Sequence, residues 1–158
     1  MIRRARPDES DALLHVQRAA AIEAFAHVFP PESFPFPDDE VREAWRRGLA
    51  DPAIEVFVAE VDGEIVGSVS VGHGFLRTLY VLPSHQGTGV GSELHDHALD
   101  RLLALGAHEA KLWTLEENDS ARRFYERRGW KLNGETRVVE FPPNPIDVGY
   151  SLPLAERE

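Results

Sequence analysis

The sequence predicts an α/β fold built on a mixed β-sheet, and three observations lead to this prediction. The spacing of apolar residues is helical in the first third of the chain and becomes strand-like after residue 54. Three strand-like runs then follow one another across short turns, as in an antiparallel meander. A helical pattern and a further strand come next and complete a βαβ unit, whose two strands are parallel and whose crossover is almost always right-handed.

The first third of the chain is expected to form two helices joined by a proline-rich connection. After a short edge strand at residues 2–6, Asp8 is placed to cap a helix that is expected to span residues 8–26. Four prolines exclude a regular helix from residues 29–37. Three phenylalanines in that segment are expected either to pack back onto the core or to form the wall of a binding pocket. A second helix is expected over residues 38–49.

Three strands are expected in the middle of the chain. Residues 55–61 are rich in β-branched side chains, and the Asp-Gly pair after them is typical of a hairpin turn. In residues 65–71 serines alternate with valines, as in a strand that is buried on one face. A turn that contains two glycines and His73 leads to the third strand, residues 75–81.

Three glycines lie where the strand at residues 75–81 turns into a helix, which is expected over residues 89–105. Such a junction exposes unpaired backbone N–H groups and the positive end of the helix dipole, and glycine lets an anion approach the backbone closely. The junction is therefore expected to bind a phosphate group. Gly106 is placed to cap the helix, and a strand at residues 110–115 completes the βαβ unit. The glycine-rich segment reads Gln86-Gly87-Thr88-Gly89-Val90-Gly91.

Other phosphate-binding motifs fit this segment less well. A dinucleotide-binding fingerprint needs G-x-G-x-x-G, but Ser92 stands where the third glycine would be. A P-loop needs Gly-Lys followed by Ser or Thr, which the chain lacks. A nucleotide-binding α/β protein of another kind and a glycine-rich turn without a ligand stay open as alternatives.

The end of the chain is expected to add one helix and a hairpin. Asn118 is a natural N-cap for the helix, and Gly129 ends it. Two last strands are expected near residues 135–141 and 146–152, separated by a proline-rich turn. The length of the whole chain suits a single domain, residues 1–158.

Two motifs of the chain resemble those of one enzyme family. The segment Gln86–Gly91 resembles the Q/R-x-x-G-x-G/A motif of the GCN5-related N-acetyltransferase (GNAT) family, which grips the pyrophosphate of acetyl-CoA. The segment Asn118–Trp130 is similar to the family's N-x-x-A-x-x-x-Y-x-x-x-G-F/W pattern, and the two motifs stand in the family's order. The resemblance covers residues 54–131 well and the flanks in outline. It implies a GNAT-like mixed sheet of about six to seven strands, flanked by helices on both faces around the central βαβ unit.

The resemblance also implies an activity and a set of site residues. The enzyme would move an acetyl group from acetyl-CoA, without a metal, to the primary amine of a small molecule or peptide by direct attack in a ternary complex. Tyr125 would be the general acid for the leaving thiolate. One backbone amide near the end of the central strand would polarise the thioester carbonyl. The implied cofactor contacts are Leu79, Tyr80, Val81, Gln86, Gly87, Thr88, Gly89, Val90, Gly91, Ser92, Asn118 and Arg122 or Arg123.

The general base and the acceptor are not evident from the sequence. His73, at the entrance to the central strand, and Glu23, late in the first helix, are two candidates for the base; the alternative for Glu23 is a place on a solvated helix face. The branch of the family that acetylates ribosomal-protein N-termini has a Glu where this chain has Trp113, so that branch's base and substrate do not transfer directly. The indole could shape the acceptor site or pack in the core. A non-catalytic acyl-CoA sensor on the same fold is the alternative function.

Composition limits the partners of the protein. The formal net charge of −10 disfavours nucleic acid as a partner and favours cationic amines. The chain has no cysteine, which excludes a disulfide, a thiolate nucleophile and a cysteine-based zinc site. It has no apolar run of membrane-spanning length and no apolar segment typical of a signal peptide near residue 1. We therefore expect a cytoplasmic protein without a membrane partner, and the sequence leaves open whether it forms a homodimer.

Overall fold

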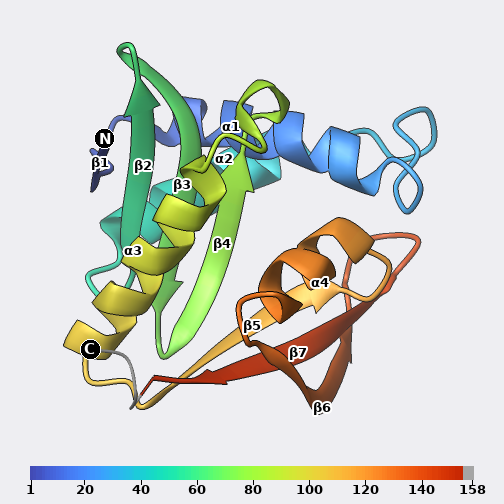
Figure 1. Cartoon of the computed structure of the whole chain (residues 1–158). Helices are drawn as coiled ribbons and strands as arrows, with labels where there is room; N and C mark the ends of the chain where they lie inside the picture. The colour runs from blue at the N-terminus through green and yellow to red at the C-terminus, as the bar shows by residue number, and fades with distance from the viewer. Residues whose placement is uncertain (155–158) are drawn as a thin grey trace.

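The computed structural model describes residues 1–154, and in these residues seven strands form one sheet with α-helices packed on it (Figure 1). The strand order is β1-β2-β3-β4-β5-β7-β6, and β4 with β5 is its one parallel pair in the described residues. The elements are β1 (Ile2–Arg4), α1 (Ser10–Phe25), α2 (Asp38–Ala50), β2 (Glu55–Val61), β3 (Glu64–Gly72), β4 (Phe75–Val81), the short 3₁₀-helix η1 (Pro83–His85), α3 (Val90–Ala104), β5 (Glu109–Leu115), α4 (Asp119–Glu126), β6 (Lys131–Val138) and β7 (Ile146–Pro153).

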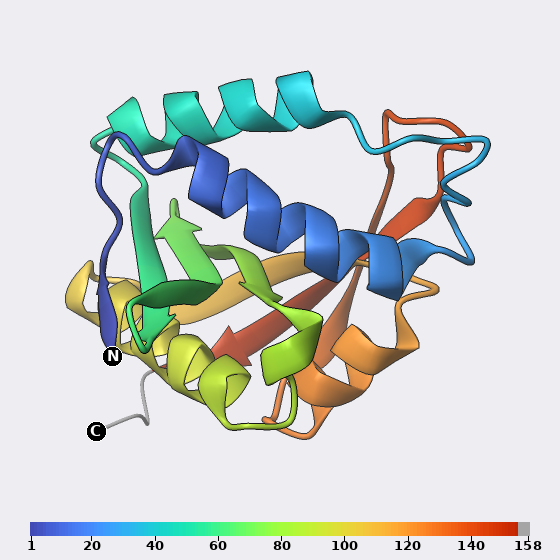
Figure 2. The ribbon, with the colours of Figure 1, turned by 90° about the horizontal axis from the view of Figure 1, so that it is seen from above.

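Helices cover both faces of the sheet (Figure 2). On the side of α1 and α2, Leu13 and Trp45 pack against the buried Val56 and Val58 of β2. The strand residues that alternate with these point to the other face of the sheet, where α3 packs. Leu94 of α3 is fully buried there in the larger core cluster. The predicted mixed α/β sheet, with seven strands and helices on both faces, is confirmed.

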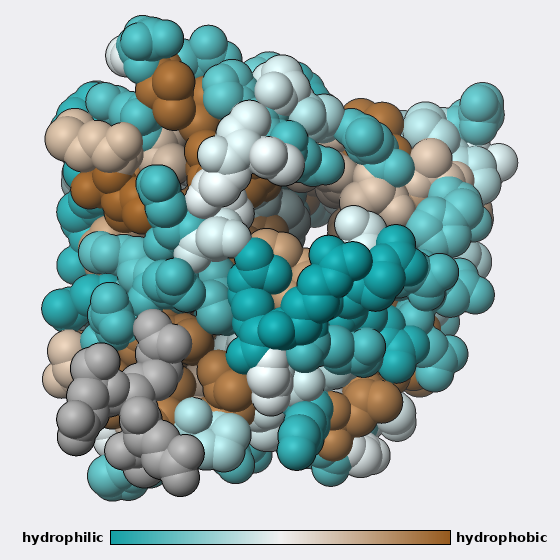
Figure 3. Space-filling view, viewed as in Figure 1, coloured by the Kyte–Doolittle hydropathy of each residue, from teal (hydrophilic) through white to brown (hydrophobic). Residues whose placement is uncertain are grey.

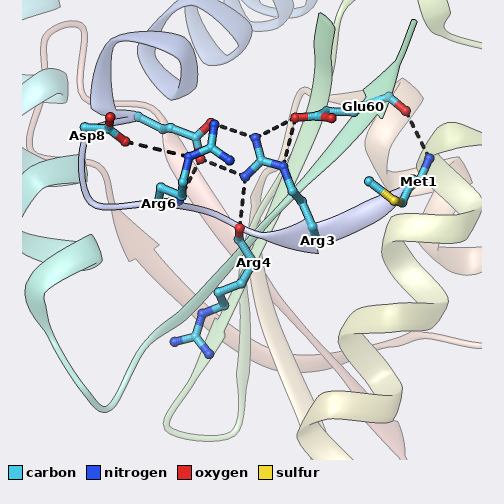
Figure 4. A network of polar contacts seen from close by, with 7 residues as sticks. Met1, Arg3, Arg4, Arg6, Asp8 and Glu60 are labelled. Atoms are coloured by element: carbon cyan, nitrogen blue, oxygen red, sulfur yellow. Dashed lines mark hydrogen bonds and ion pairs between the residues drawn. The ribbon is translucent and has the colours of Figure 1, made fainter. Parts of the chain in front are cut away.

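The start of α1 differs from the prediction. The helix begins at Ser10, and Glu9 rather than Asp8 occupies the N-cap position, where it makes no side-chain capping hydrogen bond. Its carboxylate instead accepts the backbone N–H of Arg6 at 2.6 Å and binds the Arg3 guanidinium at 2.7 Å. Arg3 also contacts Glu60 at 2.6 Å, so one guanidinium joins β1 to both α1 and β2 (Figure 4).

This arrangement fixes the charge of Glu9. Hydrogen bonds from the Arg3 guanidinium stabilise the carboxylate form and hold the pKa of Glu9 at about 2, although burial of the side chain acts in the opposite direction. The same contacts raise the pKa of Arg3 above its ordinary value. The edge strand β1 is thereby held to the sheet by charge-assisted hydrogen bonds.

Strand β6 begins at Lys131, four residues earlier than predicted. Leu132 pairs with Tyr150, and the next regular pair joins Thr136 to Val148, so three residues of β6 lie opposite one residue of β7. The predicted closing hairpin is present, with a bulge in its first strand.

Strands β4 and β5 separate along their length. Their register contains one pair, Phe75 with Lys111, and the N–H of Lys111 donates to the carbonyl oxygen of Gly74 at 3.0 Å. Beyond this point the two strands diverge toward their C-terminal ends (Figure 1). The predicted βαβ unit therefore has parallel strands that are joined only at one end, and an open split follows.

Candidate active site

A cleft of about 600 Å³ lies in the split between β4 and β5. The two strands form its walls, and the space-filling view shows the surface hollowed between the two halves of the molecule (Figure 3). The last turns of α1 line it with Ala20, Ala21 and Ala24, whose short side chains leave the space open. The glycine-rich junction after β4 and the start of α4 line the cleft as well.

The edge of β4 that faces the cleft has backbone groups available for a ligand. The N–H of Leu82 donates to Val66 of β3 at 2.8 Å. Because alternate residues of an antiparallel strand direct their N–H and C=O groups to opposite sides, Leu79 and Val81 direct theirs toward the split. Tyr80 has the same parity as Leu82, so its backbone faces β3 while the residue still lines the cleft.

The glycine-rich junction leaves a row of N–H groups unpaired. Gly87 and Gly89 have φ angles of +77° and +94°, which residues with a side chain rarely adopt. The first hydrogen bond of α3 runs from the N–H of Glu93 to the carbonyl oxygen of Gly89. Within residues 1–154, the N–H groups of residues 87–92 donate no hydrogen bond. They form a row of unpaired donors at the N-terminus of a 15-residue helix, an arrangement that suits an anion.

Side chains of the junction hold its shape. Gln86 donates to the carbonyl oxygen of Val81 at 3.2 Å, and Thr88 donates to that of His85 at 2.5 Å. The hydroxyl of Ser92 is bound by Arg128. Val90 packs against the core.

Arginines near the cleft divide into two kinds. Arg122 donates to the hydroxyl of Tyr150 at 2.9 Å and to the carbonyl oxygen of Glu116 at 3.0 Å, and it does not line the cleft. Arg127 does line the cleft, although sequence reasoning did not select it. Its position suits an anionic ligand better than that of Arg122.

The two residues of the second motif both reach the cleft. Asn118 caps α4 through a hydrogen bond from the N–H of Ala121 to its side-chain oxygen at 3.2 Å, as the sequence predicts for this helix. Tyr125 is 8 % exposed, and its ring packs edge-on against Phe124 and Trp130. In the described part of the chain nothing hydrogen-bonds to its hydroxyl.

Burial keeps both tyrosines of the cleft protonated. It raises the pKa of Tyr125 above the usual value for a phenol, and the nearby Tyr80 adds to this effect. Burial raises the pKa of Tyr80 to about 12, with a smaller contribution from the negative charge of Asp147. Each hydroxyl is therefore a hydrogen-bond donor at neutral pH.

A group of three side chains, an ion pair and an indole, lies on the β5 and β7 side of the cleft. The Arg137 Nε donates to Asp147 Oδ2 at 2.9 Å, and the guanidinium carbon lies 4.5 Å from the centre of the Trp113 ring. All three residues line the cleft, and Trp113 is half-buried and outside the core clusters. The indole therefore belongs to the cleft wall and not to the core clusters, and its expected role in shaping the acceptor site stays a prediction.

The phenylalanines of the connection between α1 and α2 gather with others at one end of the cleft. Phe29 contacts Phe25, which lines the cleft, and Phe34, each at 6.4 Å between ring centres. It also contacts Phe141 of the β6–β7 turn at 5.5 Å, and Figure 2 shows these two segments side by side. Phe29, Phe34 and Phe141 do not line the cleft themselves, and the cluster reaches it only through Phe25.

The structure does not bring the two candidate bases to the cleft. Glu23 lies exposed on α1, and His73 lies exposed in the turn between β3 and β4, with a φ of +56°. That turn adjoins the end of β4 where the split is closed. Neither residue lines the cleft. Within residues 1–154 no cluster of three or more His, Cys, Asp or Glu side chains could hold a metal ion.

A family comparison decides what kind of cleft this is. Residues 19–130 match the model of the acetyltransferase (GNAT) family. The chain belongs to this family. The match includes the glycine-rich junction, both strands of the split and the second motif.

Individual relatives of this GNAT protein agree with that assignment. An uncharacterised N-acetyltransferase of Mycobacterium tuberculosis is 32 % identical over 127 residues, which cover 73 % of this chain and 81 % of the relative. The aminoalkylphosphonate N-acetyltransferase of Salmonella typhimurium is 31 % identical over 100 residues, 57 % of this chain and 65 % of that protein.

A solved structure shares the fold of this GNAT protein. The PaiA N-acetyltransferase of Thermoplasma acidophilum, determined in complex with coenzyme A, superposes with a TM-score of 0.82 at 18 % identity, over 97 % of this chain and 98 % of that one. No helix within residues 1–154 of the present chain is long and apolar enough to span a membrane.

Proposed function

We propose that this GNAT protein transfers the acetyl group of acetyl-CoA to a primary amine by direct attack in a ternary complex. The observation that carries the proposal is the continuity of two unpaired backbone edges in one cleft. The free edge of β4 at Leu79 and Val81 is followed, after η1, by the unpaired N–H groups of residues 87–92, and both edges border the same cleft. An extended chain that ends in a pyrophosphate matches this pair of edges.

The cofactor contacts in this proposal follow from the cleft. The N–H groups of residues 87–92 bind the pyrophosphate, and Arg127 supplies positive charge beside them. Leu79 and Val81 pair with the pantetheine arm as an added strand would, and Asn118 contacts the arm from α4. Arg122 is engaged with Tyr150 and has no role in this assignment.

The reaction forms a C–N bond and breaks a C–S bond. The amine attacks the thioester carbonyl as the neutral base, and one free amide of β4 donates to the oxygen on which negative charge develops. Tyr125 donates to the sulfur as it leaves. A thiol has a pKa of ~8.5, so complete proton transfer from a phenol with a raised pKa is uphill. We therefore expect most of the contribution of Tyr125 to come from its hydrogen bond to the sulfur.

No side chain is assigned as the base, because Glu23 and His73 lie outside the cleft. The ammonium formed by the attack loses its proton to water in the open cleft, and the released thiolate takes up one proton. The absence of cysteine agrees with direct attack, since it excludes an acyl-cysteine intermediate. Residues 1–158 are taken as one catalytic domain.

The relatives support an amine acceptor and CoA as the carrier. The Salmonella relative is named for the acetylation of an aminoalkylphosphonate, and the PaiA structure contains coenzyme A. Calorimetry with acetyl-CoA, ATP and NAD tests the ligand, and we expect binding of acetyl-CoA alone. Thiol release with a panel of amines then tests transfer. Tight binding of acetyl-CoA without turnover on any amine would favour a sensor, and preference for ATP or NAD would refute the proposal.

A further inference from the structure

We infer that the acceptor amine carries an anionic group, a carboxylate or a phosphonate, and that Arg137 binds this group in the cleft. The inference rests on the proposed transfer reaction and specifies its acceptor. It is carried by three observations: the geometry of Arg137, the bulge of β6 that places it, and the sign of the charges that line the cleft.

The guanidinium of Arg137 is oriented before any ligand arrives. Its Nε is anchored to Asp147, which is 8 % exposed, and its guanidinium carbon lies over the Trp113 ring, 4.5 Å from the ring centre. The two terminal nitrogens of the guanidinium have no hydrogen bond among the described residues, and the side chain is 54 % exposed. An arginine fixed at Nε and by stacking presents its two terminal nitrogens in the geometry that binds a carboxylate or phosphonate through two oxygens.

The bulge of β6 sets this position. Residues 133–135 lie together opposite Gly149, so that Arg137 comes into register with Asp147. A Cβ atom at Gly149 would lie 2.6 Å from the side-chain oxygen of Asn133, which shows that the bulge folds over a residue without a side chain. Gly149 is also the partner of Trp113 across β5 and β7. The three side chains of the group are therefore positioned by strand pairing rather than by a flexible loop.

The charges that line the cleft differ in sign from the charge of the whole chain. The charged residues of the lining are Arg77, Arg127, Arg137 and Asp147, three cations and one anion, although the chain carries −10. Arg127 lines the cleft from the end of α4, where the next residue, Arg128, contacts Ser92 of the junction, whereas Arg137 lies across the split on β6. Arg137 is paired with Asp147 through Nε alone, so its two terminal nitrogens can bind a second anion. Asp147 Oδ1 has no hydrogen bond among residues 1–154 and can accept one from the amine of the same ligand.

The test measures binding and transfer separately. Calorimetry on the full chain saturated with CoA measures the Kd of β-alanine, 2-aminoethylphosphonate and propylamine, the last of which has no anionic group. We expect the two anionic amines to bind wild type at least about tenfold more tightly than propylamine, since hydrogen bonds to charged groups contribute ~1.5–3 kcal/mol. Initial rates with acetyl-CoA and the same three amines give kcat and KM.

Three variants separate the roles of charge and geometry. Arg137→Gln should raise the Kd and KM of the two anionic amines about 10- to 100-fold and leave those of propylamine within about twofold. Arg137→Lys keeps the positive charge without the paired nitrogens, so its Kd and KM for the anionic amines should lie between those of wild type and those of Arg137→Gln. Arg47→Gln removes the same charge from an exposed position on α2 and should change none of these constants. The affinity for acetyl-CoA reports whether the fold of each variant is intact.

Two results would overturn the inference. One is equal or weaker binding of both anionic amines compared with propylamine in wild type. The other is a loss in Arg137→Gln that is the same for all three amines. Failure of the proposed function has a different signature: the anionic amines bind in a manner that depends on Arg137, but no acetyl group is transferred to any of them.

Discussion

The replacement of Tyr125 by Phe separates a chemical role of this residue from a structural one. The variant keeps the ring, and with it the packing against Phe124 and Trp130. Because no described residue hydrogen-bonds to the Tyr125 hydroxyl, no internal hydrogen bond is lost. We therefore expect the melting temperature to change by less than ~3 °C, since ~1 kcal/mol shifts a protein of this size by ~2–4 °C.

The expected kinetic effect is larger. A hydrogen bond to a charged group contributes ~1.5–3 kcal/mol, and ~1.4 kcal/mol corresponds to a factor of ten in rate. If Tyr125 donates to the sulfur only as charge develops on it, kcat should fall at least about tenfold in Tyr125→Phe, with the affinity for acetyl-CoA nearly unchanged. Replacement of the hydroxyl by water would keep the loss near the lower end of this range.

Tyr150→Phe is the matched control. Its hydroxyl accepts from Arg122 at 2.9 Å and donates to Glu126 at 2.5 Å, and the residue does not line the cleft. Loss of these two hydrogen bonds should cost ~1–3 kcal/mol of stability, and the rate of the chemical step should stay that of wild type. Both variants are compared by thermal melting and by single-turnover rates, measured with enzyme in excess over acetyl-CoA and with saturating amine. A wild-type rate of the chemical step in Tyr125→Phe would refute the chemical role.

Three further predictions concern the junction, the N-terminal ion pairs and the core. Gly91→Glu should abolish acetyl-CoA binding in calorimetry, because it adds a negative charge at the junction assigned to the pyrophosphate, whereas the neutral Gly91→Gln should weaken binding less. Since Gly91 has an ordinary φ, neither substitution strains the backbone, and equal losses of affinity would contradict the role of charge. Arg3→Gln should destabilise the protein above pH ~4.3, the ordinary pKa of a glutamate. The difference in stability from wild type should vanish as the pH falls toward 2. The reason is that the lowered pKa of Glu9 stabilises the fold only while the carboxylate is charged. Urea unfolding at pH 6 and pH 2.5 checks this, and a difference that does not depend on pH would contradict it. His95→Leu should cost ~1–3 kcal/mol in thermal unfolding, because it leaves the buried indole N–H of Trp130 without its acceptor at 3.0 Å; an unchanged melting temperature would show that this bond is not needed.

The parts of the fold that were predicted correctly are those that local residues determine. Strands β2 and β4 begin and end at the predicted residues, because Asp62-Gly63 and Pro83 interrupt the backbone pattern at their ends. The start of β6 was predicted four residues late, and the Asn133-Gly134 pair, which is typical of turns, lies before the predicted start. The same pair lies in a bulge inside the strand, and that depends on pairing with β7, which is not a local property.

The candidate site divides in the same way. The glycine-rich junction and the positions of Asn118 and Tyr125 follow from short-range spacing, and Gln86, Gly87 and Gly91 of the junction line one cleft with Asn118 and Tyr125. Arg127, Arg137 and Asp147 were not predicted. Arg137 and Asp147 are ten residues apart on paired strands, and their contact depends on the bulge between them. The turn-like Asn-Gly pair within a strand was the available signal, since bulges are frequent beside active sites.

The net charge of the chain does not predict the sign of the charges that line this cleft, because charged residues far from the cleft act only weakly in it. The chain carries −10, but acidic residues such as those in the first turn of α2 lie on the exposed surface away from the split. At physiological ionic strength the interaction between exposed charges decays over ~8 Å, so remote carboxylates contribute little inside the cleft. The arginines of the lining act at contact distance and in a partly buried site, where screening is weaker. An acidic protein can therefore have a cleft that suits an anionic ligand, and the proposed preference for an acceptor with an anionic group rests on this local balance.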